Sequence, residues 1–393
     1  MDRDSRDRLE RRKSEIFVVF GTRPEAIKMA PVISELQKQE SVKTGIISSG
    51  QHDELLEQML ENFSISPDKN LQLMENDQSL TDLTGRALSR LSELFRRERP
   101  DLIMVHGDTT TTFSAALAAY YNQIPVAHVE AGLRSHDRYS PFPEEMNRHL
   151  TDVLADIHFA PTLTNRENLL AENVSARNIY VTGNTVIDAV QCIASQDFSL
   201  PHHLQEIVSD GEKEIILLTT HRRENMGEDM EKIFAAVREI AGEFEDVEVI
   251  FPLHLNPGVR KPALSLLGGE EGIHLIEPLD YSTFINLLGR SRLILTDSGG
   301  IQEEAPALDI PVVLLRETTE RPEALEAGTV LKAGTKKERI VEITARLLRE
   351  EDYYRSVARR ENPYGDGRAA ARVVKGALNY LGLSSERAEE FTP

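Results

Sequence analysis

The chain has 393 residues, and its 45 Lys and Arg against 65 Asp and Glu give a formal net charge of −20. This acidic balance disfavours nucleic-acid and anionic-membrane partners, so an anionic substrate would need locally focused positive charge. The single cysteine, Cys192, excludes an intrachain disulfide and a cysteine metal cluster, and favours a reducing compartment. Because no apolar run approaches about 18 residues and the first residues lack a signal-peptide core, we expect a cytoplasmic protein without membrane insertion.

The first half of the chain has the rhythm of parallel βαβ units. Residues 1–15 alternate acids and bases and predict a disordered extension, because they cannot bury enough apolar surface to offset ordering. From Ile16 onward, short β-branched runs alternate with segments of helical period. The predicted strands are 16–20, 43–47, 101–106, 125–129, 157–160 and 179–182.

The same rhythm restarts in the second half, after a polar stretch at 195–213 that we expect to be irregular. Strands are predicted at 214–220, 247–252, 273–277, 292–296 and 311–315, and helices at 336–349, 350–361 and 366–381. The fold class is therefore α/β, with two facing Rossmann-like, doubly wound domains. The expected ranges are a 1–15 extension, an N-terminal domain at 16–183, a C-terminal domain at 184–362, a last helix at 363–381 that docks on the first domain, and a 382–393 tail.

Residues that follow the strands are unusually polar, and in open α/β sheets ligands bind beyond the carboxyl ends of the strands. Gly21 permits a tight turn after the first strand, and Arg23 and Lys28 lie near the following helix start. Cations at a helix amino end oppose the macrodipole, which favours an anion site over a bland surface pair.

Three acids follow strands or open helices in this half. Asp108 follows a predicted strand and could be a plain helix N-cap, whereas Glu130 directly follows buried strand residues. Glu144 lies in the first turn of a helix, where dipole complementarity alone would explain it. Together they predict a proton-transfer site in which like-charge neighbours raise the pKa of at least one carboxyl group.

The second half carries complementary, cationic and glycine-rich groups. His221 follows its first strand together with two arginines, and Arg321 adds a further cation. The Ser298-Gly299-Gly300 turn lets backbone N–H groups approach a diphosphate, although such a tripeptide is also a common tight turn.

Residues for the rest of a nucleotide follow. A glutamate at 303 or 304 could accept ribose hydroxyls, and the segment 277–284 offers an apolar wall for a flat base. Phe284 in that segment is equally expected in the core, and His254 receives no assignment.

Several familiar motifs are missing. The sequence has no G-x-x-x-x-G-K-[ST] loop, H-E-x-x-H pair, Cys/His cluster or G-x-S-x-G elbow. The one dinucleotide-type match, at 365–370, follows Asn-Pro-Tyr instead of a strand, so we reject it. We expect neither a metal site nor bound NAD.

A series of collinear blocks resembles the bacterial and archaeal non-hydrolysing UDP-N-acetylglucosamine 2-epimerases. They are GTRPEAIKMAP (21–31), HGDTTTT (106–112), HVEAGLRS (128–135), SPFPEEMNR (140–148), TGNTVID (182–188), THRREN (220–225), TDSGGIQEEAP (296–306), TTERPEA (318–324) and NPYGDG (362–367). The resemblance covers residues 16 to about 380. It implies a glycosyltransferase-B architecture with the ligand between two domains, a homodimer, and interconversion of UDP-N-acetylglucosamine and UDP-N-acetylmannosamine without cofactor.

The resemblance also implies a mechanism and residue roles. Loss of the C2 proton accompanies departure of UDP, giving 2-acetamidoglucal, and re-addition with protonation on the opposite face gives the epimer. By matching positions, the catalytic carboxylates are Asp108, Glu130 and Glu144, and the groups that position UDP are Arg23, Lys28 and His221. Ser298, Gly299 and Gly300 match the diphosphate loop, and Glu304 matches the ribose ligand. Arg321 matches a further cation of the nucleotide site, and Leu279 and Phe284 match the uracil pocket.

One departure and three alternatives stay open. Family members activated by their substrate have glutamines in a QHxQ-like stretch, whereas this chain has Glu54 in Gln51-His52-Asp53-Glu54, which puts that activation in doubt. The alternatives are a hydrolysing epimerase that releases UDP and N-acetylmannosamine, a glycosyltransferase of the same architecture, and a non-catalytic UDP-sugar-binding module. Three neighbouring acids disfavour the last, because a pure anion binder gains nothing from them.

Overall fold

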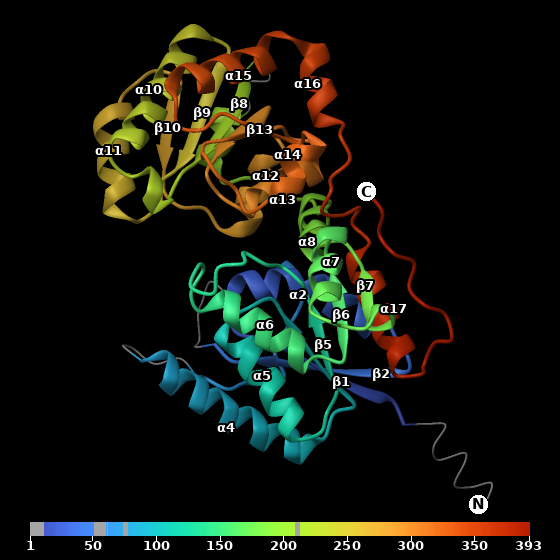
Figure 1. The fold of residues 1–393 in the computed structure, drawn as a ribbon. Coiled ribbons are helices and arrows are strands. Elements are labelled where there is room, and N and C mark those ends of the chain that lie inside the picture. The colour runs from blue at the N-terminus through green and yellow to red at the C-terminus, as the bar shows by residue number, and fades with distance from the viewer. Residues whose placement is uncertain (1–11, 51–59, 61, 74–77, 209–212) are drawn as a thin grey trace, which may run out of the picture. The chain divides into compact units, whose positions relative to one another are not determined.

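The chain divides into two compact units. The computed structural model describes residues 12–50, 60, 62–73, 78–208 and 213–393. One unit comprises residues 1–189 and 364–392, and the other comprises residues 190–363 (Figure 1). The divisions fall after Ala189 and Pro363, close to the boundaries expected after residues 183 and 362.

A seven-stranded parallel sheet forms the centre of the first unit, in the order β3-β2-β1-β4-β5-β6-β7. The strands expected from apolar runs are present, and the two-residue β3 was missed because it is too short to carry a pattern. The first strand starts at Ser14, inside the extension expected over 1–15. The strands are β1 (Ser14–Phe20), β2 (Val42–Ser48), β3 (Lys69–Asn70), β4 (Leu102–His106), β5 (Val126–Val129), β6 (Ile157–Ala160) and β7 (Ile179–Val181).

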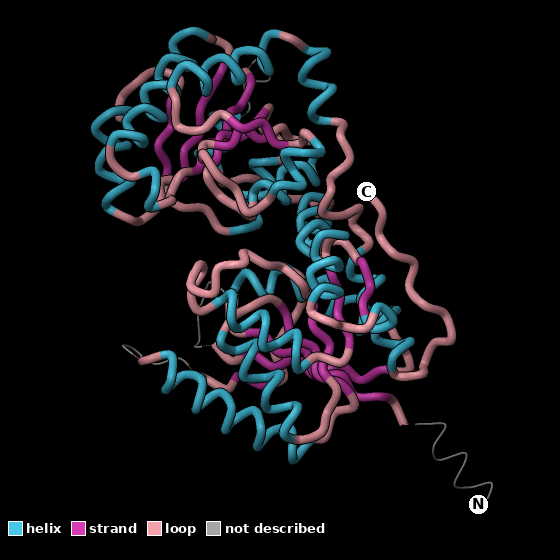
Figure 2. Tube along the Cα trace, in the orientation of Figure 1, coloured by secondary structure: helices cyan, strands magenta, loops and turns pink. Residues whose placement is uncertain are grey.

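Helices cover this sheet, as Figures 1 and 2 show. Alternate residues of β1 point to opposite faces, and Phe17 and Val19 pack against Leu91 and Phe95 of one helix. The helices are α2 (Arg23–Gln37), α4 (Leu80–Glu98), α5 (Thr110–Tyr121), α6 (Glu144–Leu154), α7 (Leu163–Ala171), α8 (Thr185–Ala194) and α17 (Ala369–Tyr380), with a 3₁₀ turn η1 (Ala176–Asn178).

The second unit has a six-stranded parallel sheet in the order β10-β9-β8-β11-β12-β13. Its last, three-residue strand was not predicted, because it is short and only its first residue is fully buried. The strands are β8 (Glu214–Thr219), β9 (Val247–Pro252), β10 (Ile273–Ile276), β11 (Leu293–Thr296), β12 (Val312–Leu314) and β13 (Val330–Lys332).

One helix of this unit contradicts the expectation of an irregular stretch at 195–213. Residues 202–208 form a helix of which only Leu204 is fully buried, so the stretch carries no apolar periodicity. Elsewhere, Phe234 and Ile240 of one helix pack on Val249 and Phe251 of β9. The helices are α9 (His202–Val208), α10 (Glu228–Glu243), α11 (Pro257–Leu267), α12 (Tyr281–Leu288), α13 (Ile301–Glu304), α14 (Pro322–Ala327), α15 (Lys337–Arg349) and α16 (Glu351–Ala358), with 3₁₀ turns η2 (Arg223–Asn225) and η3 (Ala305–Leu308).

The last helix, α17, belongs to the first unit, where it packs against α2 and β6. Gly376 permits this close approach, because a Cβ there would lie 2.6 Å from Phe159 Cε1. Asp188 of α8 accepts hydrogen bonds from the backbone N–H groups of Ala369 and Ala370 at 3.1 and 2.9 Å. The chain therefore returns to its first sheet after completing the second.

Among the helices of the described residues, none is both long and apolar enough to cross a membrane.

Candidate active site

Each sheet reverses its strand order at one point, and ligands of doubly wound sheets bind at such points, beyond the carboxyl ends of the strands. In the first unit the reversal lies between β1 and β4, and in the second between β8 and β11. A buried carboxylate joins the two loops at each reversal: Glu25 in the first unit and Asp297 in the second.

Glu25 connects the loop after β1 to the start of α5. Its Oε2 accepts from the backbone N–H groups of Gly21 and Thr22 at 2.9 and 2.7 Å, completing the capping box of α2. Its Oε1 accepts from the hydroxyls of Thr109 and Thr112 at 2.7 and 2.8 Å. The threonine run at 109–112, poor in helix propensity, therefore locks two helix starts together.

The turn after β1 requires glycine. A Cβ at Gly21 would lie 2.5 Å from Ser49 Oγ and 2.6 Å from Thr111 Oγ1, and these two hydroxyls are themselves hydrogen-bonded at 2.8 Å. The backbone can thus approach the neighbouring loops closely. Arg23, at the first turn of α2, is exposed and makes no hydrogen bond or ion pair with another described residue.

Glu130 follows β5 and lies in a cluster with Lys28 and Asn184. Lys28 Nζ donates to Glu130 Oε2, and Asn184 Nδ2 donates to the same oxygen at 2.9 Å. Glu130 has a φ of +65°, a left-handed conformation that is unusual for a residue other than glycine and is often found at functional sites.

The electrostatics of this cluster favour the ionised form of Glu130. Burial alone would raise the pKa of Glu130, but the cation of Lys28, together with His106, outweighs it and holds the pKa well below the usual range. Glu130 is therefore not the acid whose pKa like-charged neighbours raise, and that expectation stays a prediction for the site. The cation that contacts its carboxylate is Lys28.

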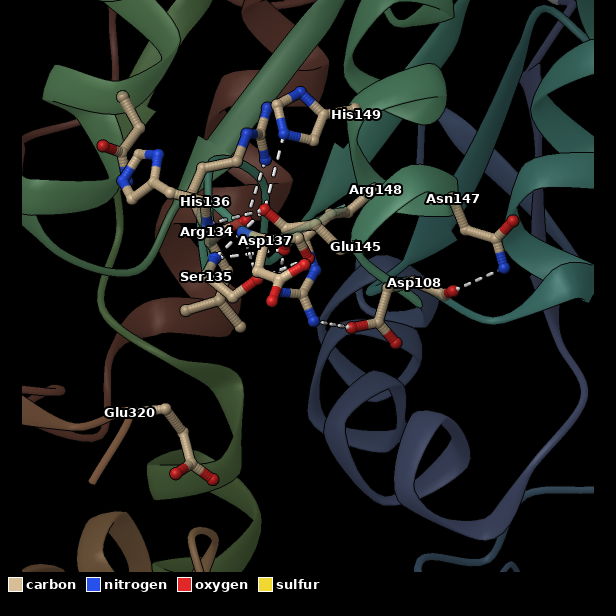
Figure 3. Close-up of polar contacts among 12 residues, drawn as sticks. Asp108, Arg134, Ser135, His136, Asp137, Glu145, Asn147, Arg148, His149 and Glu320 are labelled. Carbon is tan, nitrogen blue, oxygen red and sulfur yellow. Dashed lines mark hydrogen bonds and ion pairs between the residues drawn. The ribbon is translucent and has the colours of Figure 1, made fainter. Parts of the chain in front are cut away.

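Asp108 is held by Arg148 of α6 (Figure 3). Arg148 Nη2 donates to Asp108 Oδ2 at 2.5 Å, and Asn147 Nδ2 donates to the backbone carbonyl of Asp108 at 3.0 Å. Asp108 is not the N-cap of α5, because Thr109 takes that place and accepts from Thr112 N. Its carboxylate is therefore available for a role other than capping.

The neighbouring acids of α6 divide their roles. Glu145 is buried, and its carboxylate accepts from Arg148 Nη1 at 2.9 Å and from the backbone N–H groups of Ser135 and His136 at 3.0 Å (Figure 3). These contacts outweigh the effect of burial and lower the pKa of Glu145. Glu144 is half-buried and makes no hydrogen bond or ion pair with another described residue. The sequence did not single out Glu145 or Arg148.

A buried network supports the loops that carry Asp108 and Glu130. His128 Nδ1 lies 2.6 Å from Asp152 Oδ1 and Nε2 lies 2.7 Å from the carbonyl oxygen of Gly107. Both partners can accept a hydrogen bond, so the imidazole links Asp152 of α6 to the loop after β4. Arg134 donates to Asp152 Oδ2 at 2.7 Å. His128 and Arg134 together outweigh burial and hold the pKa of Asp152 far below its usual range.

The three predicted acids therefore come from one edge of the first sheet. Asp108 and Glu130 follow the adjacent strands β4 and β5, and Gly107 N donates to Val129 O at 3.0 Å between them. Glu144 opens the helix that supplies Arg148 to Asp108.

In the second unit, Asp297 organises the loop after β8. It is fully buried, and accepts from Thr220 Oγ1 at 2.7 Å and Asn225 Nδ2 at 2.9 Å. The backbone N–H groups of His221 and Arg222 also point at its carboxylate, at 3.1 and 3.0 Å. Asp297, which directly follows β11, therefore holds the loop that carries His221.

His221 is half-buried between Asp297 and His254. Its Nδ1 lies 3.4 Å from Asp297 Oδ1, and its ring stacks on His254 with centroids 5.6 Å apart and planes 21° apart. Burial lowers the pKa of His221, and Arg222 and His254 add to this against the attraction of Asp297. His254, which the sequence left unassigned, is thus a packing partner of a predicted site residue.

The Ser298-Gly299-Gly300 turn lies directly after Asp297. Ser298 N donates to Thr296 Oγ1 at 3.0 Å. Gly299 is buried, and a Cβ there would lie 2.8 Å from Glu320 Oε1, whereas Gly300 is exposed with open space beside it. A Cβ at Gly299 would therefore displace the end of the exposed Glu320 side chain, whereas Gly300 is accessible.

The remaining predicted nucleotide residues have partners inside the unit. Arg321 Nε donates to Glu303, which is buried. The Tyr281 hydroxyl donates to Glu304 Oε1 at 3.1 Å, and burial raises the pKa of Tyr281 well above its usual value, which keeps it a donor. Glu303 and Glu304 thus face different partners.

The two predicted uracil-pocket residues frame the start of α12. Leu279 lies in the loop before this helix and Phe284 lies within it, and both are half-buried. Asp280 caps the helix by accepting from Thr283 N at 2.9 Å.

Two further sequence-based expectations concern a metal and an activator. Within the described residues, no group of three or more His, Cys, Asp or Glu side chains is arranged to hold a metal ion. The stretch Gln51 to Glu54, on which the question of substrate activation rests, lies outside the described residues.

Comparison with known proteins decides the family. The family model described as UDP-N-acetylglucosamine 2-epimerase matches residues 34–377. The chain belongs to this family. The UDP-N-acetylglucosamine 2-epimerase of Bacillus subtilis is 50% identical over 381 residues, which cover 97% of this chain and 99% of the relative.

Solved epimerase structures share the two-domain α/β fold. A crystal structure of a UDP-N-acetylglucosamine 2-epimerase matches with a TM-score of 0.91 and 48% identity, over 97% of this chain and 100% of the other. The Neisseria meningitidis UDP-GlcNAc 2-epimerase bound to UDP-GlcNAc matches with a TM-score of 0.82 and 46% identity, over 93% of this chain and 100% of the other. The matches therefore span both units of this chain and the whole of each compared chain.

Proposed function

We propose that this epimerase is non-hydrolysing and reversibly converts UDP-N-acetylglucosamine to UDP-N-acetylmannosamine. The relatives that match over nearly their whole length carry the epimerase name, and one was solved with UDP-GlcNAc bound. The product would supply precursors for a cell-surface glycan or polysaccharide.

The proposed chemistry is elimination followed by re-addition. A base removes the C2 proton, the C–H electrons form the C1–C2 double bond, and UDP leaves C1 with the electron pair of the C1–O bond. The resulting 2-acetamidoglucal then takes a proton at C2 on the opposite face as UDP adds back to C1. This route needs proton-transfer groups for two faces of the sugar and strong stabilisation of the leaving diphosphate.

The observation that carries the proposal is the pair of carboxylates after adjacent strands β4 and β5. Asp108 is paired with Arg148, and Glu130 is paired with Lys28, whose cation helps to hold the pKa of Glu130 well below its usual range. We assign proton transfer at C2 to the set Asp108, Glu130 and Glu144. Of these, Glu144 has no partner among the described residues, so its carboxyl group is available to the sugar.

The second unit binds the nucleotide in this proposal. His221 positions or stabilises UDP, with Arg23 and Lys28 of the first unit, and the turn Ser298 to Gly300 offers backbone N–H groups to the diphosphate. Glu304 accepts from the ribose, Arg321 adds positive charge, and Leu279 and Phe284 contact uracil. The half-buried positions of these last two side chains suit a flat base.

We also propose a homodimer. Neighbouring helices α5 and α6 expose large apolar side chains: Tyr120, Tyr121, Leu150 and Val153, the last 79% exposed. A second copy of the chain would remove them from water, which is favourable. Light scattering should therefore give twice the mass of the chain, and Val153→Glu should shift it towards the monomer; a monomeric wild type would reject the dimer.

Product analysis tests the function. Purified protein incubated with UDP-N-acetylglucosamine alone should form UDP-N-acetylmannosamine until the two nucleotide sugars reach a constant ratio. ³¹P and ¹H NMR measure both compounds. Continuous release of UDP and free N-acetylmannosamine would support the hydrolysing alternative instead. Turnover only after addition of a sugar acceptor would support a glycosyltransferase.

A further inference from the structure

A buried histidine at the end of β4, His106, has no role in the proposed reaction. It is 3% exposed, and neither ring nitrogen has a hydrogen-bond partner among the described residues. Buried polar groups are nearly always hydrogen-bonded, so an unpaired imidazole costs stability and calls for a reason. Its backbone carbonyl, by contrast, accepts from Thr112 Oγ1 at 2.6 Å.

The nearest charged partner of His106 is the carboxylate of Glu130. His106 Nε2 lies 3.5 Å from Glu130 Oε2, which is within ion-pair range and beyond a normal N–H···O hydrogen bond. The two groups therefore interact through charge rather than through a shared hydrogen bond.

All the contacts of Glu130 gather on one of its two oxygens. Lys28 of α2 and Asn184, which precedes α8, both donate to Oε2, and His106 of β4 faces the same atom. Lys28 and His106 are the titratable groups that face Glu130 among the described residues, and Asn184 is neutral. The described residues donate no hydrogen bond to Oε1, so this oxygen is the one that can exchange a proton with a substrate.

We infer that His106 is a positioning residue for Glu130. The imidazole of His106 and the ammonium group of Lys28 hold Oε2 of Glu130, which keeps Oε1 free as the proton-exchanging oxygen. The inference rests on the proposed function, in which Glu130 belongs to the proton-transfer set. When Oε1 takes the C2 proton, the carboxylate loses its charge and its attraction for an imidazolium. When the proton returns to the sugar, the attraction is restored.

The direction of the effect follows from electrostatics. His106 and Lys28 oppose the effect of burial and hold the pKa of Glu130 well below its usual range. An opposite charge at this distance lowers a carboxyl pKa by about 1–3 units. Without His106, Glu130 would be protonated at a higher pH, and the fraction of enzyme with an ionised Glu130 would fall on the acid side.

The test is the pH profile of His106→Gln and His106→Asn. We expect the acid limb of the kcat/KM profile to move to higher pH by about one unit or more. At a fixed pH on the acid side of the limb, kcat/KM of the variant should then be lower than that of the wild type by about tenfold for each unit of this shift. The Kd for UDP should stay unchanged, because His106 is not among the residues proposed to bind the nucleotide. His202→Gln, which removes an exposed imidazole from α9, is the control and should match the wild type.

A double-mutant cycle separates positioning from packing. In a Glu130→Gln background, His106→Gln should cause no further loss of kcat, because its effect acts through Glu130. An unshifted acid limb in both His106 variants, or an equal further loss in the Glu130→Gln background, would overturn the inference. Failure of the wild type to epimerise would instead reject the proposed function, so the two failures are distinguishable.

If both His106 variants fail to fold, the wild type and Glu130→Gln carry the test. The imidazole carbon chemical shift of His106 in ¹³C-histidine-labelled protein should then differ between the wild type and Glu130→Gln, because the charged carboxylate that faces Nε2 at 3.5 Å is gone. The same chemical shift in both proteins would overturn the inference.

Discussion

The two acids at the edge of the first sheet, Asp108 and Glu130, differ in how the protein holds them. Glu130 is enclosed by Lys28, His106 and Asn184, whereas Asp108 is half-buried with Arg148 on one oxygen. Figure 3 shows the second oxygen of Asp108 without a dashed contact. A carboxylate held on one side and open on the other is suited to proton transfer.

Replacing Asp108 by Asn tests this role. The amide oxygen can still accept from Arg148, so we expect the fold and UDP binding to persist, while the lost carboxylate lowers kcat for epimerisation by about 10²–10⁴-fold. Isothermal titration with UDP and a coupled assay for UDP-N-acetylmannosamine measure the two properties. Asp229→Asn, on an exposed pair with Lys232, is the matched control. Near-normal turnover of Asp108→Asn would remove Asp108 from the catalytic set.

Adjacent residues at the start of α6 show what the sequence could and could not predict. Two successive helix residues point about 100° apart, so only one of Glu144 and Glu145 can face the loop at Ser135. The sequence singled out Glu144, and the structure shows that Glu145 holds the loop and Arg148. Which acid faces which partner depends on the helix rotation, and that is set by packing distant in the sequence.

At the level of elements, the long apolar strands were predictable and the pieces without a pattern were not. Every strand expected from an apolar run is present, whereas β3, β13 and α9 are short or expose most of their residues. The threonine run before α5 was unexplained by helix propensity. Its explanation is Glu25, which lies more than 80 residues earlier in the chain.

Glu25→Gln tests how firmly that carboxylate joins α2 to α5. The amide loses the negative charge that accepts from several donors at once, and hydrogen bonds to charged groups contribute about 1.5–3 kcal/mol each. We expect the free energy of unfolding of the first unit to fall by about 2 kcal/mol. Urea denaturation measures this change. Glu35→Gln, on an exposed pair with Lys38 of the same helix region, should change it by less than about 0.5 kcal/mol. Equal stabilities of the two variants would contradict this role.

Asp188 gives the docking of α17 a pH dependence. Burial, with Asp366, raises the pKa of Asp188 from 3.8 to about 6, although the N–H groups of Ala369 and Ala370 favour the ionised form. The folded state therefore binds this proton more tightly than the unfolded chain. The resulting stabilisation is fully present at a pH below the pKa that Asp188 has in the unfolded chain, and it is lost as the pH rises through about 6.

We expect α17 of the wild type to lose protection relative to Asp188→Asn as the pH rises from about 4 to about 7, by on the order of 2 kcal/mol. Hydrogen–deuterium exchange of residues 369–380, corrected for intrinsic rates, measures this opening energy. Asp352→Asn, on the exposed surface of α16, is the control, and the difference in opening energy between it and the wild type should not depend on pH. A constant difference between wild type and Asp188→Asn would show that the carboxyl group does not titrate there.

On the scale of the whole molecule, two units of similar design divide the proposed chemistry. Each has a parallel sheet whose order reverses once, and at each reversal a buried carboxylate fixes the loops that carry the candidate residues. The overall charge is −20, and the cations Arg23, Lys28 and Arg321 are the groups proposed to face the anionic substrate. The collinear motifs made this division predictable, while the partners of each side chain required the fold.

The central claim is that epimerisation proceeds by removal and return of the proton at C2. Incubation with UDP-N-acetylglucosamine in D₂O, followed by NMR and mass spectrometry of the separated nucleotide sugars, tests it most directly. The account predicts one deuterium at C2 of UDP-N-acetylmannosamine. Product formed with its original C2 hydrogen would contradict it.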